Sequence, residues 1–176
     1  MKGLYILASI TGFLVLELWL GWYQAAAPVL SAGAFYLTVI YGWRLLFFPL
    51  VLAGVVMDLT LGRSFVYHAA LILPGVMGLA QFWRREGNCR VLAYQMVPGG
   101  LCGLWQAGIL LALESFGRER ITWRLVLHNL WIAAQYTGFG VILLPVLCRI
   151  WDRIAGRLTL PRYREIQQKP AELHVS

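Results

Sequence analysis

The feature that most constrains this chain is an apolar run over residues 3–22, which contains a single charged residue, Glu17. At a rise of about 1.5 Å per residue, a helix over this run is as long as the ~30 Å hydrocarbon core of a bilayer. Such a run is longer than the apolar region of a secretory signal peptide, and Pro28 follows the small residues that a signal peptidase would need. The sequence therefore predicts a retained first membrane-spanning helix.

Five more apolar segments follow the first one. Hydrophobic residues make up 60% of the chain and charged residues 13%, against about 25% charged in a soluble domain. A single helix through Arg44 would bury that charge in the bilayer at a cost of about 3 kcal/mol, so two short helices are expected there. We expect an all-α, polytopic membrane bundle over residues 1–148, with spans at 3–22, 28–43, 45–61, 64–83, 91–113 and 125–148.

The basic residues predict the orientation of these six spans. Eleven Lys and Arg fall on the side that holds both termini and four on the other, and an excess of positive charge marks the cytoplasmic side. Both termini are therefore expected in the cytoplasm. Arg149, Arg153 and Arg157 recur at helical spacing until Pro161. They predict a basic amphipathic helix over 149–161 on the inner leaflet, or a solvated positive tail, followed by disorder over 162–176.

The formal charge of +7 does not indicate nucleic-acid binding, because the basic residues lie in short clusters between apolar blocks. The three cysteines show no metal-binding spacing. The sequence contains no phosphate-binding glycine loop, nucleophile elbow or paired acidic motif for magnesium. We expect no enzyme activity, no cofactor, no metal and no nucleic-acid partner, and membrane lipid as the surroundings.

The candidate functional residues are charged or polar groups inside the apolar segments. Glu17 and Asp58 are functional candidates because intramembrane carboxylates are costly, although both could instead reach headgroups near a helix end. Further polar residues could line a cavity or join helices by hydrogen bonds; these are His68, Gln95, Gln106, His128, Asn129 and Gln135. Gly99, Gly103 and Ala107 repeat every four residues, which predicts close contact with another helix, of this chain or of a partner.

One segment resembles a known family. The residues from Gly54 to Gly62, with Asp58-Leu59 near their end, and the following Tyr67-His68-Ala69 resemble the rod shape-determining protein MreD family of bacterial inner-membrane proteins. Val66 departs from the family pattern, which commonly has a second glycine there. The closing Leu-Leu-Pro-Val-Leu run before the basic residues is also similar.

The resemblance implies a non-enzymatic subunit of the machinery that elongates the cell and builds its lateral peptidoglycan. Its implied partner is an MreC-type protein and, indirectly, the MreB filament and the RodA and penicillin-binding protein synthase. Asp58 and Gly62 would then shape the turn between the third and fourth helices. The alternative is a substrate-binding subunit of an energy-coupling-factor vitamin transporter, in which Glu17, Gln95, Gln106 and Gln135 would contact a small metabolite.

Overall fold

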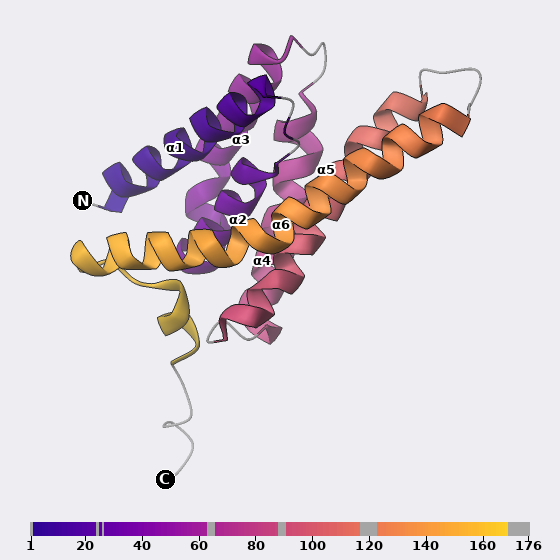
Figure 1. Ribbon diagram of the computed structural model, residues 1–176. Helices are drawn as coiled ribbons and strands as arrows, with labels where there is room; N and C mark the ends of the chain where they lie inside the picture. Colours follow the sequence, from indigo (N-terminus) through magenta and orange to yellow (C-terminus); the bar gives the residue numbers. More distant parts are fainter. Residues whose placement is uncertain are drawn as a thin grey trace.

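The computed structural model describes residues 2–23, 25, 27–62, 66–87, 91–116 and 123–168. Every regular element in these ranges is helical, so the all-α prediction is confirmed for them (Figure 1). The α-helices are α1 (Lys2–Trp22), α2 (Val29–Tyr41), α3 (Trp43–Thr60), α4 (Leu73–Glu86), α5 (Met96–Phe116) and α6 (Trp123–Arg157). Shorter segments are the π-helix η1 (His68–Ile72) and the 3₁₀ helices η2 (Leu92–Gln95) and η3 (Tyr163–Gln168).

Four helical stretches are long and apolar enough to cross a membrane, which indicates a membrane protein. They are Lys2–Trp22, Trp43–Thr60, Ala93–Leu113 and Val126–Arg157. The helix α2 is also apolar but has only 13 residues, a length of about 20 Å that falls short of the hydrocarbon thickness.

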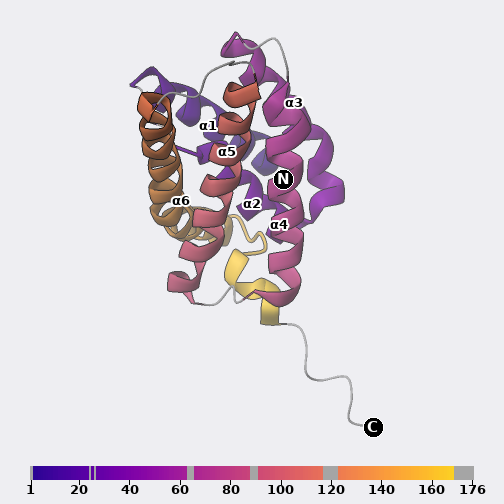
Figure 2. The same cartoon turned by 90° about the vertical axis from the view of Figure 1, so that its right-hand side faces the viewer.

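The short helix α2 is the centre of the molecule. Every residue from Val29 to Ile40 is buried, and α2 contacts α1, α3, α4, α5 and α6. Figure 2 shows it enclosed by the other helices. An apolar helix that is buried on all sides meets protein rather than lipid, so its length need not match the bilayer.

The helix α6 does not end where the sixth span was expected to end. It continues without a break from Trp123 to Arg157, so the expected boundary between residues 148 and 149 does not separate two helices. Pro145 lies inside α6, and the helix changes direction along its length, so that its last part runs below α1 in Figure 1. A proline bends a helix because it removes one backbone hydrogen bond and crowds the preceding turn.

The segment after α6 is also more ordered than expected. After α6 ends at Arg157, Thr159 has a φ of 54°, and the Leu160 amide donates to the Ala155 carbonyl at 2.9 Å, the arrangement that commonly closes a helix. Tyr163 is then fully buried and begins η3. Residues 163–168, part of the segment expected to be disordered, form η3, and the Tyr163 side chain returns to the bundle. Residues 169–176 lie outside the described ranges.

Candidate functional site

Glu17 is buried and accepts a hydrogen bond from the first turn of α2. Its side chain is 5% exposed, and its Oε2 accepts a hydrogen bond from the amide of Leu30 at 2.5 Å. Leu30 is the second residue of α2, and Pro28 at the cap position supplies no side-chain acceptor. The first amides of a helix lack partners within the helix, and a negative group there is favourable. Glu17 therefore caps α2 from α1, and the expected alternative of contact with headgroups is wrong.

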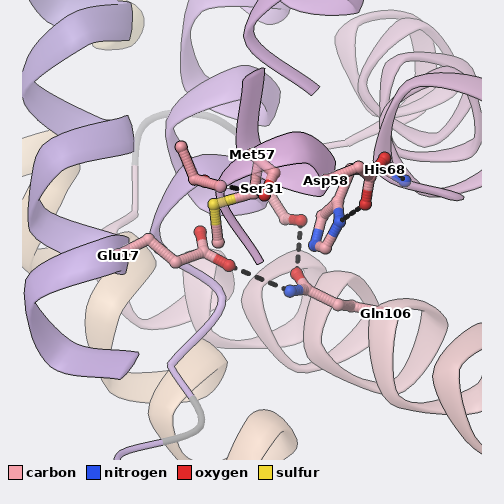
Figure 3. Close-up of polar contacts among 7 residues, drawn as sticks. Glu17, Ser31, Met57, Asp58, His68 and Gln106 are labelled. Atoms are coloured by element: carbon pink, nitrogen blue, oxygen red, sulfur yellow. Dashed lines mark hydrogen bonds and ion pairs between the residues drawn. The ribbon is translucent and has the colours of Figure 1, made fainter. Parts of the chain in front are cut away.

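Gln106 extends this contact to α5. Its Nε2 donates to Oε1 of Glu17 at 3.0 Å, and its Oε1 accepts from the Ser31 hydroxyl at 2.5 Å. Figure 3 shows the Gln106 amide between Glu17 and Ser31. One buried amide thus joins α1, α2 and α5. Ser31 carried no signal in the sequence beyond being a polar residue in an apolar helix.

Asp58 makes a second cap between α3 and the next helical segment. It is fully buried; its Oδ2 accepts from the His68 amide at 2.8 Å, and its Oδ1 lies 2.6 Å from His68 Nδ1. Because both oxygens engage the start of η1 (Figure 3), contact with headgroups is wrong for Asp58 as well.

The backbone around Asp58 also requires glycine at two positions. Gly54, one turn earlier, faces the backbone of Ala69, where a Cβ would lie 2.7 Å from the Ala69 nitrogen. Gly62 has a φ of +64°, a conformation that favours glycine. Part of the turn, residues 63–65, lies outside the described ranges.

A third carboxylate, Asp152, was not singled out from the sequence. Its Oδ1 accepts from the Tyr36 hydroxyl and from the Tyr163 amide, each at 2.9 Å. The Tyr163 hydroxyl donates to Gln95 Oε1 at 2.5 Å, and the rings of Tyr36 and Tyr163 stack at 5.8 Å between centroids. The available signal was one acidic residue inside the arginine stripe of α6.

The three carboxylates follow one rule. Each carboxylate accepts a hydrogen bond from a backbone amide at the start of the next helical segment. The amide lies 13 residues after Glu17, 10 after Asp58 and 11 after Asp152. In the interior of a membrane protein no bulk water can satisfy such amides, so the acceptor must come from the protein. We name these three residues the carboxylate caps.

The small residues of α5 pack against α6 of the same chain. A Cβ on Gly99 would overlap the carbonyl oxygen of Gly140, and a Cβ on Gly103 would overlap that of Tyr136. Ala107 is 1% exposed. We name the contact of Gly99, Gly103 and Gly140 the glycine seam.

The remaining expected residues do not form one cavity. Glu17 and Gln106 meet, but Gln95 binds Tyr163 instead, and Gln135 is half-buried on α6. Arg149, Arg153 and Arg157 are exposed on α6. Within the described part of the chain, no cluster of three His, Cys, Asp or Glu side chains could hold a metal ion.

These features define an all-helical membrane protein whose described buried carboxylates hold helix starts. The chain matches no family model, no curated protein and no solved structure in the comparisons with known proteins.

Proposed function

We propose that this chain is a non-enzymatic scaffold subunit of the bacterial inner membrane, acting in the cell-elongation machinery. The observation that carries the proposal is the arrangement at Asp58. The residues that resemble the MreD family, Asp58, Gly62 and His68, are those that form the cap and turn between α3 and η1. A protein whose buried polar groups hold its own helices acts on others through its outer surface and loops.

The proposal includes six crossings with both termini in the cytoplasm. The described ends of the helices support alternating sides. A Cβ on Gly42, before α3, would lie 3.2 Å from an Arg84 guanidinium nitrogen near the end of α4, and Tyr163 after α6 meets Gln95 before α5. These segments share one end of the bundle (Figure 1). They carry most of the described arginines. Arg63, Arg90, Arg118, Arg120 and Lys169 lie outside the described ranges.

Under this proposal the direct partner is an MreC-type protein, with the MreB filament and the RodA and penicillin-binding protein synthase engaged through it. The test is co-purification of the two membrane proteins from cells that express both, together with depletion of this chain in its own host. We expect co-elution in mild detergent and a loss of rod shape on depletion. Absence of co-elution despite good expression, with unchanged cell width and length, would contradict the proposal.

Asp58 variants connect the phenotype to the cap. Asp58→Asn keeps an acceptor for the His68 amide, whereas Asp58→Ala does not. We expect complementation by the Asn variant and loss with the Ala variant at equal protein levels in the membrane. Equal loss with both variants would assign the effect to the charge instead.

The vitamin-transporter alternative receives less support from the geometry. It requires Glu17, Gln95, Gln106 and Gln135 around one ligand, but Gln95 bonds to Tyr163, and Glu17 and Gln106 bond to each other and to α2. Tight retention of a small metabolite through purification would favour the transporter over the scaffold.

A further inference from the structure

An apolar groove lies between the first half of α1 and the last part of α6. It has a volume of about 400 Å³, and its lining includes Leu4, Ala8, Ser9, Trp151, Ile154 and Leu158. Two polar groups on its walls are engaged within the protein: the indole of Trp151 donates to the Ser9 hydroxyl at 3.0 Å, and the Tyr5 hydroxyl donates to the Trp151 carbonyl at 3.5 Å. The groove therefore presents an apolar surface to an occupant.

Basic residues adjoin this groove on both helices. Arg153 and Arg157 come directly before the lining residues Ile154 and Leu158, and Lys2 lies two residues before Leu4. All three basic residues are exposed. Three residues along a helix correspond to about 60° around its axis, so Arg157 lies beside the lining residue Ile154 and the arginine edge of α6 borders its groove-lining face. Asp152 does not face the lipid, because it is buried and accepts from Tyr36 and Tyr163.

We propose that this groove binds an acyl chain of an anionic phospholipid, whose phosphate lies at Arg153 and Arg157, with Lys2 on the opposite wall. Both walls belong to helices that are long and apolar enough to cross a membrane, so the groove opens to lipid rather than to bulk water. Basic residues beside an apolar cleft near a membrane surface select anionic over zwitterionic headgroups. The site depends on membrane insertion and is independent of the proposed role in cell elongation.

The test measures thermal unfolding and native mass spectra of the full chain in detergent, titrated with phosphatidylglycerol or with phosphatidylcholine of the same acyl chains. We expect phosphatidylglycerol to raise the unfolding midpoint and to remain bound in the gas phase, with phosphatidylcholine having a much smaller effect. The double variant Arg153→Gln/Arg157→Gln should bind phosphatidylglycerol about tenfold more weakly, because each arginine near an anionic headgroup contributes favourably. The matched control is Arg44→Gln/Arg85→Gln, two exposed arginines that have no groove-lining residue beside them in the sequence.

A second pair of variants tests the groove without changing charge. Ala8 is exposed and lines the groove, so Ala8→Phe should occupy part of the acyl-chain volume and weaken phosphatidylglycerol binding. Val15→Phe, on an exposed part of α1 outside this groove, is the control. Equal effects of the two lipids, equal loss in the two arginine pairs, or full binding by Ala8→Phe would overturn the proposal. So would an equal midpoint shift with inorganic phosphate alone, since the acyl chain would then contribute nothing.

Discussion

Two regions of this molecule hold helices together in different ways. In one region, the carboxylate caps Glu17, Asp58 and Asp152 accept hydrogen bonds from backbone amides at the starts of helical segments. In the hairpin of α5 and α6, the glycine seam allows two backbones to approach, and Gly99 and Gly103 lie against carbonyl oxygens of α6. The first region depends on side chains that are present and the second on side chains that are absent.

The two regions differ in whether their backbone amides already have hydrogen-bond acceptors. The interior start of α2 leaves amide donors that lipid cannot bond, so an acceptor is required there. Long antiparallel helices already satisfy their own backbone groups, and they associate through close packing of small residues. Removal of a cap should therefore cost the free energy of unmet donors, whereas enlargement of a seam residue should cost steric strain.

Glu17→Ala should have the largest effect. The change removes the acceptor of both the Leu30 amide and the Gln106 side chain in a buried position, for an expected loss of about 4 kcal/mol in unfolding free energy. Glu17→Gln should lose about half as much, because it keeps one acceptor. The measurement is denaturant or thermal unfolding in detergent, with the exposed Glu86→Ala as control. Equal stability of Glu17→Ala and Glu86→Ala would show that the Glu17 carboxylate does not stabilise the start of α2.

Gly103→Val should be the next most severe change. The new side chain would meet the backbone of Tyr136, and overpacking of this kind should cost about 3 kcal/mol. Gly108→Val lies on the same helix with nothing within 4 Å of its Cβ, so it should be nearly neutral. Crosslinking between cysteines introduced across α5 and α6 would report separation of the hairpin. Similar destabilisation by both variants would show that the loss does not come from the contact between Gly103 and Tyr136.

Asp58→Ala should lower the unfolding free energy by about 2 kcal/mol, because the His68 amide loses its acceptor. Asp58→Asn should recover part of this loss. Thr60→Ala is the control, because the Thr60 hydroxyl donates a hydrogen bond within its own helix, to the Met57 carbonyl at 2.9 Å. Identical values for Asp58→Asn and Asp58→Ala would show that the acceptor is not what stabilises the turn.

Tyr163→Phe should have the smallest effect, about 1 kcal/mol. It removes the hydrogen bond to Gln95 but retains the ring stacked on Tyr36 and the amide bonded to Asp152. Limited proteolysis after α6 should become faster, while Tyr94→Phe, on an exposed ring, should leave the rate unchanged. An unchanged rate in Tyr163→Phe would show that the phenol hydroxyl does not retain η3 in the bundle.

Much of the fold was accessible from the sequence because long apolar runs identify membrane helices directly. The break at Arg44 correctly separated α2 from α3, whose described ends lie at Tyr41 and Trp43. The burial of α2 among the other helices could not be predicted from the sequence, since an apolar helix that faces lipid and one that faces protein have the same composition.

The site was only partly accessible for a similar reason. Glu17 and Asp58 are conspicuous in apolar segments, but their amide partners are backbone groups that leave no trace in residue type. Gln106 is 89 residues from Glu17, and no local pattern connects them. Asp152 was missed because it lies among arginines in a segment expected on the membrane surface. Tyr163 was missed because the polar composition after residue 161 indicated disorder, while a single aromatic residue determined the return of the chain.

The brevity of α2 has a consequence for biosynthesis. A helix of 13 residues is too short to be stably inserted in lipid by its own hydrophobicity, and the Ser31 hydroxyl meets Gln106, a residue translated 75 positions later. The ribosome must therefore deliver α5 before α2 acquires its final surroundings. Until then, α2 can pack only against α1, α3 and α4, so its surroundings are completed after more than half of the chain has been translated.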